Sequence, residues 1–388
     1  MDMKTLQSKT LLLAMAIYGV SVIAAGAALA DVNPPLAPLG DPPIPADNPQ
    51  SPKKIELGKM LFFDPRLGGD ASTGCVQCHE PEQGWGFSDD LSRGYPATVH
   101  WRNSQTVINS AYLSGFFWAT SAGSLEKQAK SAATGAVAGN GESDVMEARL
   151  AFIPKYRGLF REVFGTPWPR IGDAWRAIAA FERTLVQKDT PVDKYLKGDK
   201  KALTKQQVRG MKLFNGKANC IECHNGALTT DEKFYNLGVP PAGRWNEDSL
   251  AQITFRYEIY AKGVTQELYR KLKDDPGLYF RTKEKSDMGK FRTPSLRYAK
   301  YTAPYMHNGS FWDLKEVVNF YNAGGGSNEF TDGKIAKNKT KLIKPLGLSE
   351  KQVDDLVAFI EAFSGPEIKM AKPKLPPYAP LPDVAEAQ

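Results

Sequence analysis

A chain of 388 residues, 42% of them hydrophobic, is long enough to bury a large core and to form two domains. Its formal net charge of +7 comes from 50 basic and 43 acidic residues, without the clustered basic patch that is typical of nucleic-acid-binding proteins. We therefore expect no nucleic-acid partner. Lysine-rich stretches such as residues 334–344 are either solvated loops or surfaces that attract an acidic redox partner.

The first thirty residues have the order of a secretory signal. Lys4 and Lys9 form a charged start, residues 11–25 an apolar run, and Ala28-Leu29-Ala30 a small-residue cleavage site. An uncleaved membrane anchor is the alternative, although the apolar run is short for a membrane span. We expect cleavage near residue 30, a periplasmic location, and no stable membrane insertion of the mature chain.

An extended leader and a helix are predicted next. Residues 31–52 contain eight prolines and little periodicity, which favours an extended chain. Residues 52–63 are predicted to be helical, with Ile55, Met60 and Leu61 facing the core.

Two loops, residues 64–74 and 81–101, flank a cysteine-rich sequence at residues 75–79. The second loop is rich in Gly, Asp and Ser and has no clear period. Loops of this length in a compact domain are often functional.

Helical periodicity returns in the middle of the chain, and residues 188–203, rich in lysine and aspartate, connect two halves. Gly365 is expected to end the last helix, and the proline-rich tail 366–388 to be poorly ordered. Helices are predicted over residues 143–152, 154–164 and 171–187, and capping boxes pair Thr204 with Gln207, Asp313 with Glu316, and Ser349 with Gln352. With almost no strand pattern, the predicted fold class is mostly α.

Two sequences, Cys75-x-x-Cys78-His79 and Cys220-x-x-Cys223-His224, have the spacing that attaches a c-type haem. Two thiols three positions apart can add to the two vinyl groups of one porphyrin, and the following histidine then lies under the iron. All four cysteines of the chain are used in this way, so none is left for a disulfide. A zinc site is the alternative, but it usually takes four thiolates or two well-spaced histidines. The sequence predicts two covalently bound haem c groups.

Further motifs accompany these two sequences. They are Arg102-Asn103-Ser104, Phe117-Trp118 followed by residues 124–129, Thr293-Pro294-Ser295-Leu296-Arg297, and Pro304-Tyr305-Met306-His307-Asn308-Gly309-Ser310. Together they resemble the bacterial di-haem cytochrome c peroxidase and MauG family over residues 53–365. The resemblance implies two c-type-cytochrome-like haem domains with long loops, which we expect at residues 53–190 and 200–365.

In this family the N-terminal haem reacts with peroxide and the C-terminal haem handles electrons. The resemblance makes His79 the proximal ligand of the reactive haem and His224 that of the electron-transfer haem. Trp118 matches the tryptophan that carries charge between the haems, with a core indole as the alternative.

The family also holds a calcium ion between the haems, bound by one side-chain amide oxygen, two backbone carbonyls and water. Asn103, Thr302 and Pro304 match these positions, and oxygen ligands are those that a hard cation such as Ca²⁺ prefers. Without the resemblance, all three are loop or turn residues.

Tyr321 distinguishes two branches of the family. On pattern alone it is a core tyrosine of the helix that begins at Asp313. Peroxidases of the family place a methionine here as the distal ligand of the electron-transfer haem, whereas MauG-like proteins place a tyrosine. The resemblance therefore assigns Tyr321 to the MauG-like branch, which stores oxidising equivalents on both haems. Met306 and Met288 are the alternative ligands.

The reactive pocket departs from the family pattern. Gln128 is kept, but the acid–base glutamate that helps to cleave the peroxide bond falls at or near Ala138, and general acid–base catalysis typically contributes about 10²–10⁴-fold. Three alternatives follow. A nearby carboxylate replaces it, with Glu142 ahead of Asp144 and Glu147; or His100 is a distal ligand; or the pocket is open to dioxygen or another oxidant. A solvated helix start is the alternative interpretation of the carboxylates.

The predicted function is a periplasmic di-haem oxidoreductase that uses hydrogen peroxide. The expected partner is a small c-type cytochrome, a cupredoxin, or a protein whose side chain is oxidised. An electron-transfer or redox-sensing protein with a non-peroxidatic N-terminal haem is the alternative, because the family glutamate is missing.

Overall fold

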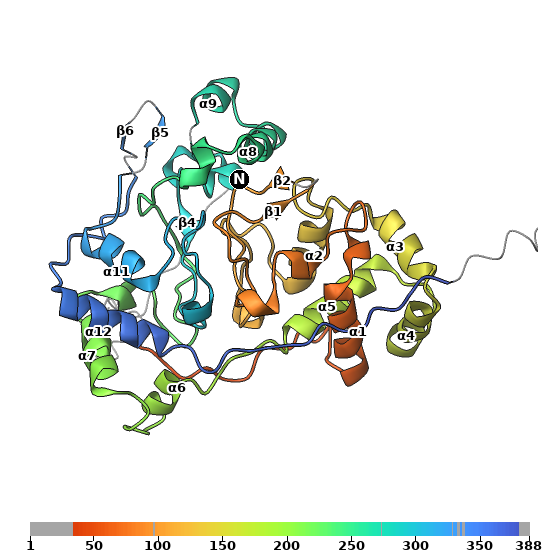
Figure 1. Ribbon diagram of the computed structural model, residues 1–388, viewed down its shortest axis with the longest axis horizontal. Coiled ribbons are helices and arrows are strands. Elements are labelled where there is room, and N and C mark those ends of the chain that lie inside the picture. The colour runs from red at the N-terminus through yellow and green to blue at the C-terminus, as the bar shows by residue number, and fades with distance from the viewer. Residues whose placement is uncertain are drawn as a thin grey trace, which may run out of the picture. The chain divides into compact units, whose positions relative to one another are not determined.

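The computed structural model describes residues 34–95, 98–272, 274–327, 329–331, 334–335 and 338–379, so the predicted signal segment 1–30 lies outside the described residues. The described chain is mostly α, as predicted (Figure 1). Its helices are α1 (Pro52–Phe63), α2 (Leu125–Thr134), α3 (Ser143–Ala151), α4 (Pro154–Phe164), α5 (Ile171–Glu182), α6 (Pro191–Leu196), α7 (Lys205–Asn215), α8 (Ser249–Ala261), α9 (Gln266–Lys271), α10 (Tyr279–Thr282), α11 (Leu314–Asn322) and α12 (Glu350–Glu361). No helix within the described ranges combines the length and the apolar character that a bilayer span requires.

Strands are short and form antiparallel pairs. β1 pairs with β2, β3 with β4, and β5 with β6. The strands are β1 (Arg93–Gly94), β2 (Thr98–Val99), β3 (Phe234–Tyr235), β4 (Phe291–Arg292), β5 (Glu329–Thr331) and β6 (Lys334–Ile335). They fasten loops to one another and form no extended sheet in the part of the chain that the structure describes.

The predicted helix starts agree with the structure better than the predicted helix ends do. All three predicted capping boxes are present, at α7, α11 and α12. α5, however, ends at Glu182 and not at residue 187. The side chain and backbone of Asn109 explain this, because its amide oxygen accepts the Gln187 N–H at 2.8 Å and its own N–H donates to Leu185 O at 2.8 Å.

Hydrophobic residues form three main clusters. The first joins α1, α3, α4 and α5, and the second joins α7, α11 and α12. The third packs α8 and its neighbours against Val99 and Trp101, and so combines residues from both halves of the sequence. The helices α8, α9 and α10, which the sequence did not predict, contribute to this third cluster or lie next to it.

The proline-rich tail corrects two predictions. α12 ends at Glu361, so Gly365 does not end it; the Gly365 N–H instead donates to Gln187 Oε1 at 2.8 Å. Residues 366–379 are not poorly ordered. They form an extended strap that runs from α12 across the N-terminal helices (Figure 1) and is held by hydrogen bonds. Ile368 O accepts the Trp85 indole N–H at 2.8 Å, which holds this strap in place.

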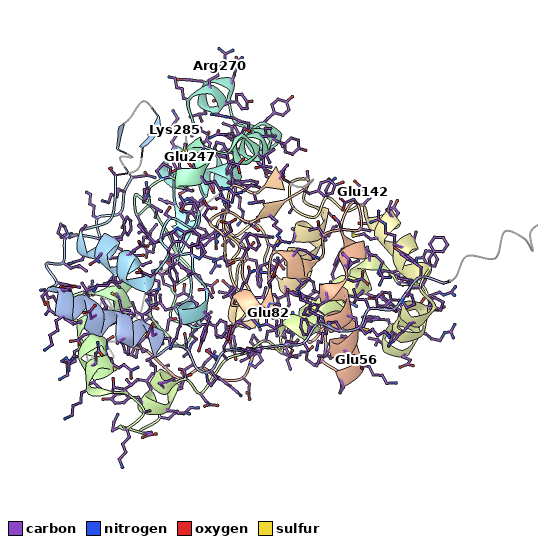
Figure 2. All side chains as sticks on the ribbon, in the orientation of Figure 1. Glu56, Glu82, Glu142, Glu247, Arg270 and Lys285 are labelled. Atoms are coloured by element: carbon purple, nitrogen blue, oxygen red, sulfur yellow. The ribbon has the colours of Figure 1, made fainter. Side chains whose placement is uncertain are left out.

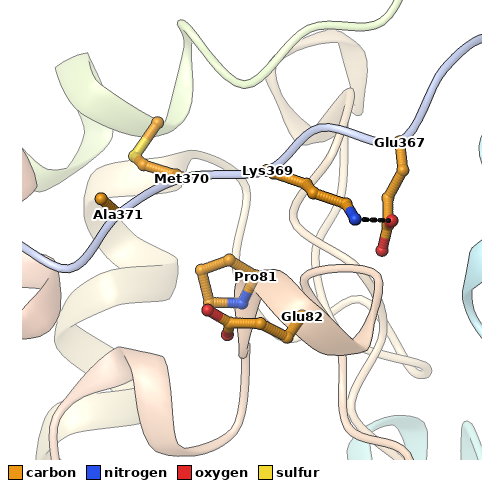
Figure 3. Close-up of a pocket in the computed structure, with 6 residues that line it drawn as sticks. All are labelled: Pro81, Glu82, Glu367, Lys369, Met370 and Ala371. Carbon is orange, nitrogen blue, oxygen red and sulfur yellow. Dashed lines mark ion pairs between the residues drawn. The ribbon is translucent and has the colours of Figure 1, made fainter.

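Two more contacts hold the far end of the strap, where Pro376 O accepts from Arg66 at 2.8 Å and the Ala379 N–H donates to Phe152 O at 3.1 Å. The strap also borders a cavity of ≈ 530 Å³ (Figure 3). Pro81 and Glu82, just beyond the first cysteine-rich motif, line the opposite wall. The extended tail therefore passes close to that motif.

The leader forms a second strap, extended as predicted. Its Leu39 N–H donates to Asp193 Oδ1 at 3.2 Å, and Ala37 O accepts from Arg297 at 3.3 Å. Asp193 and Arg297 are themselves joined by two hydrogen bonds of 2.7 and 2.9 Å, and both are almost fully buried. Farther along the leader, Asn48 donates to Glu126 Oε1 at 2.8 Å, so the leader contacts both halves of the chain.

The buried Asp193–Arg297 pair gives the first testable prediction. Asp193→Asn should lower the free energy of unfolding by about 3–5 kcal/mol, because the buried Arg297 guanidinium loses its counter-charge. Urea denaturation measures the loss. The control is Asp189→Asn, which breaks the exposed Asp189–Lys197 pair and should cost about 1 kcal/mol at most. Equal losses in the two variants would contradict the prediction.

The same pair predicts an acid dependence. Burial alone would raise the pKa of Asp193, but hydrogen bonds from Arg297 and Thr190 outweigh it and hold the pKa below the usual 3.8. Because the folded state has the lower pKa, this stabilisation is present above pH 3.8 and is lost as the pH falls through the folded value. Asp193→Asn should therefore flatten the acid limb of the unfolding curve.

Candidate functional site

The first cysteine-rich motif forms a single 3₁₀ turn over Cys75–Gln77. The Cys78 and His79 N–H groups both donate to Cys75 O, at 3.2 and 3.1 Å. Side chains three residues apart lie on one side of such a turn, so both thiols face the same way. His79 Nδ1 lies 3.3 Å from Trp85 O. Since a carbonyl only accepts, Nδ1 carries the hydrogen, and the Nε2 lone pair is left for a metal.

The second motif repeats this geometry. Its 3₁₀ turn covers Cys220–Glu222, and the Cys223 and His224 N–H groups donate to Cys220 O at 3.3 and 2.9 Å. His224 Nδ1 lies 3.2 Å from Thr229 O, which fixes the same tautomer. The two motifs occur in different hydrophobic clusters, with Cys75 beside the first and Cys220 beside the second.

The thiols and imidazoles suit covalent haem better than zinc. All four cysteines lie in the described part of the chain, and none of them forms a disulfide there. Burial raises the pKa of Cys220 to about 12 and that of Cys223 to about 11, and it also raises the pKa of Cys75 and Cys78. Zinc needs thiolates, whereas a thioether forms from a thiol. Burial also lowers the pKa of His79 to about 4, which keeps this imidazole neutral, as an iron ligand must be.

Trp118 connects the two halves of the chain. Its indole N–H donates to Asn103 O at 3.0 Å, and its own carbonyl accepts the Arg292 N–H at 2.9 Å. The residue is 9% exposed, and its ring meets the buried His307 ring edge-on, with centroids 6.4 Å apart. The indole is therefore held rigidly where segments from both halves meet.

The oxygen atoms predicted to bind calcium lie near Trp118. The Asn103 side-chain amide donates to Asp89 O at 3.0 Å, which orients its Nδ2 and leaves Oδ1 without a hydrogen bond among the described residues. The Thr302 and Pro304 carbonyls likewise accept none within these ranges. Calcium at Asn103, Thr302 and Pro304 stays a prediction, which these free oxygen atoms support.

Tyr321 lies on α11, as the sequence predicted, with Leu314 and Val318 buried on the same side. Burial raises the pKa of Tyr321, and the nearby Cys223 and Cys220 thiols raise it further. The phenol is therefore close to the second motif and is protonated in the absence of a metal. Deprotonation by iron would make it an anionic ligand.

The distal pocket of the first motif offers no obvious replacement for the missing glutamate. Gln128 lies half-buried on α2. Glu142 directly precedes α3, makes no capping hydrogen bond with its side chain, and is exposed at the surface (Figure 2). Asp144 is also exposed, and Glu147 accepts the Trp168 indole N–H at 2.8 Å. Glu142 and Asp144 therefore have the environment of a solvated helix start, and Glu147 is engaged by Trp168.

His100 is half-buried and stacked on Trp101, with ring centroids 3.9 Å apart. Its Nδ1 accepts the Arg102 N–H at 3.1 Å, so Nε2 carries the hydrogen. Burial lowers the pKa of His100 to about 3, which keeps the ring neutral. In this arrangement neither ring nitrogen offers a free lone pair to iron.

Sequence reasoning missed two buried charged side chains near the motifs. Glu182 on α5 interacts electrostatically with Cys75, and burial raises its pKa to about 8. Arg292 on β4 is 2% exposed and lies beside Trp118. Nothing in the local sequence distinguishes either residue, because their burial comes from tertiary packing.

Comparison with known proteins identifies the family. The sequence matches the family model of di-haem cytochrome c peroxidases over residues 52–201. It is 54% identical to the cytochrome-c peroxidase IdrP1 of Pseudomonas sp. (strain SCT), over 96% of this chain and 98% of that relative. The chain belongs to the di-haem cytochrome c peroxidase and MauG family. The protein is thus a di-haem peroxidase with two c-type haems, which uses peroxide and a protein partner.

Other relatives extend the similarity to the MauG-like branch. The methylamine utilization protein MauG of Methylorubrum extorquens is 33% identical, over 86% of this chain and 84% of its own. A solved MauG-like protein associated with microbial copper homeostasis has a TM-score of 0.70 at 29% identity, covering 84% of this chain and 93% of its own. The di-haem peroxidase BthA from Burkholderia thailandensis E264 shares the fold, with a TM-score of 0.65, 21% identity, and coverage of 84% and 92%.

Covalent attachment gives the second testable prediction. Replacing both Cys75 and Cys78 by Ala should leave a chain that still carries one covalently bound haem, because the second motif is built independently. Mass spectrometry of the denatured protein counts the haems. The matched control replaces Cys220 and Cys223 and should also retain one. Two covalent haems in either variant would refute the assignment of that motif.

Proposed function

We propose that this protein is an exported, periplasmic peroxidase of the MauG-like branch. The reactive haem is attached to Cys75 and Cys78 with His79 as ligand. The electron-transfer haem is attached to Cys220 and Cys223 with His224 and Tyr321 as ligands. The observation that carries the proposal is the rigid position of Trp118, which contacts Asn103 from the N-terminal half and Arg292 from the C-terminal half.

When bound, the haems supply the redox chemistry that reduces hydrogen peroxide to water and takes two electrons from a partner. The chain controls the path of charge. The Trp118 N–H is hydrogen-bonded to a backbone carbonyl, which is too weak a base to take its proton. An electron therefore leaves or returns to the indole while the proton stays on nitrogen, and this suits a rapid relay.

Calcium would support the same relay. Asn103 binds the Trp118 indole through its carbonyl and offers its side-chain oxygen to the ion. Thr302 and Pro304 offer carbonyls from the C-terminal half. An ion bound by all three would hold both halves at a fixed separation around Trp118.

The electrons come from a protein, either a small c-type cytochrome or cupredoxin, or a protein whose side chain is oxidised. The presence of a tyrosine at position 321 favours the last of these, because an anionic phenolate lowers a haem potential and stabilises oxidised states, whereas methionine raises it.

A second candidate function is electron transfer or redox sensing without peroxide turnover. Ala138 in place of the family glutamate and the exposure of Glu142 favour it. The two functions differ in whether peroxide is consumed, so a titration distinguishes them.

The third prediction tests the proposed function directly. Stoichiometric peroxide added to the diferric protein should abolish a high-spin ferric EPR signal and produce a long-lived oxidised optical spectrum, without prior reduction. In Trp118→Phe, the first haem should still react with peroxide. The optical features that arise when the two haems share the oxidising equivalents should be lost. Unchanged charge sharing in this variant would refute the relay.

Two other outcomes of the titration have clear meanings. Two low-spin haems that react only after one is reduced would identify a gated peroxidase. Indifference to peroxide in both redox states, together with no turnover on several donors, would establish the electron-transfer alternative.

The fourth prediction concerns Tyr321. Tyr321→Met should raise the midpoint potential of the C-terminal haem, because a neutral thioether replaces an anionic oxygen ligand. Redox titration followed optically measures this change, with Tyr305→Phe as a control. Tyr305 also lies near the second cluster, but its hydroxyl donates to Ala299 O at 2.8 Å. A potential that stays the same in Tyr321→Met would exclude Tyr321 as a ligand.

A further inference from the structure

Arg292 is held in an unusual position for a charged residue. It lies on β4, where it pairs with Phe234 of β3, and its N–H donates to Trp118 O at 2.9 Å. Its side chain is buried, with 2% of the residue exposed. Hydrogen bonds therefore hold the backbone at Arg292, and its guanidinium lies away from solvent.

The guanidinium has only distant partners among the described residues. Its Nε and Nη1 form no hydrogen bond there, and Nη2 reaches only Gln105 Oε1, at a long 3.4 Å. The nearest carboxylate, Glu232, is 3.9 Å from Nη1 and already accepts the Ser114 and Gly115 N–H groups at 3.1 and 3.3 Å. Burial lowers the pKa of Arg292, and Glu232 opposes this only in part.

A second buried arginine of the chain has the close carboxylate partner that Arg292 lacks. Arg297 is equally buried, but Asp193 accepts two hydrogen bonds from it at 2.7 and 2.9 Å. A buried charge without such a partner is costly. The two Arg292 nitrogens that form no hydrogen bond among the described residues, Nε and Nη1, are free to donate to carboxylate oxygens.

The surroundings indicate which carboxylate this is. Gln105, which contacts Arg292, has its backbone carbonyl beside the His79 ring. Pro294, two residues after Arg292, has its carbonyl beside the His224 ring. Arg292 is thus linked through Gln105 to the His79 segment, through Pro294 to the His224 segment, and by its backbone N–H to Trp118.

We propose that Arg292 binds a haem propionate and thereby fixes that haem next to Trp118. This rests on the proposed attachment of haems at the two motifs. Arg292 acts here as a positioning residue, since it holds the cofactor and takes no part in breaking the peroxide bond. Either haem could supply the propionate, and the experiment distinguishes them.

The test uses the full-length protein with both haems and needs no peroxide. Optical redox titration gives the midpoint potential of each haem in the wild type, Arg292→Gln and Arg292→Lys. Arg292→Gln should lower the potential of one haem, because an uncompensated carboxylate favours the ferric state. Arg292→Lys keeps the charge and should lower it less. The haem whose potential falls is the one whose propionate is bound.

The control is Arg209→Gln, which makes the same substitution at a half-exposed side chain paired with Asp355 and should change neither potential. Unchanged potentials in Arg292→Gln, at full haem content, would overturn the proposal. If Arg292→Gln does not fold, resonance Raman spectra of Arg292→Lys decide. A shifted propionate bending band supports the proposal, and an unshifted one overturns it.

These readouts are independent of the proposed function. Haem content per chain reports whether the motifs are loaded, and the potentials report the propionate contact. A protein that binds both haems but ignores peroxide would still show the shift. Failure of the peroxidase proposal and failure of this one are thus distinguishable.

Discussion

The indole N–H of Trp118 donates a 3.0 Å hydrogen bond to Asn103 O, and Trp118 O accepts the Arg292 N–H at 2.9 Å. These two bonds join a loop of the N-terminal half to β4 of the C-terminal half. Asn103 in turn donates its N–H to His307 O at 2.7 Å. These three hydrogen bonds connect the segments of Asn103, Trp118, Arg292 and His307, and a displacement of one half would break the two that cross between the halves.

The extended leader and the strap of residues 366–379 also join parts of the chain that are far apart in sequence. The leader is anchored at the buried Asp193–Arg297 pair, and the tail at Trp85 and Arg66. Neither strap has regular secondary structure, so each is held by hydrogen bonds to specific side chains and by a few apolar contacts. Each segment is ordered by the residues that it contacts, and its hydrogen bonds link those residues to one another.

Local chemistry decided what could be predicted from the sequence. The capping boxes at Thr204, Asp313 and Ser349 need only residues three positions apart, and all were found. The haem motifs are equally local, and the structure gives each of them the same 3₁₀ turn. Fold class and family followed from such short signals.

Long-range contacts decided what could not be predicted. The order of residues 366–379 comes from partners such as Trp85, nearly 300 residues away, while proline-rich composition alone suggests an unstructured tail. The early end of α5 depends on Asn109, which competes for backbone groups from another segment. The long distances from the buried Arg292 guanidinium to Glu232 and Gln105 cannot be predicted from the sequence for the same reason.

The buried arginines of the chain differ in how closely a carboxylate compensates their charge. The chain pairs its buried Arg297 with Asp193 and its largely buried Arg102 with Asp275, at 2.5 Å, so it does not leave buried guanidinium groups without carboxylates by default. Arg292 differs because its best contact among the described residues is a long hydrogen bond to Gln105. A protein that folds around two cofactors can leave such a charge open, because the cofactor brings the missing anion. In the proposed arrangement, the carboxylate that compensates the Arg292 charge beside this junction belongs to the haem.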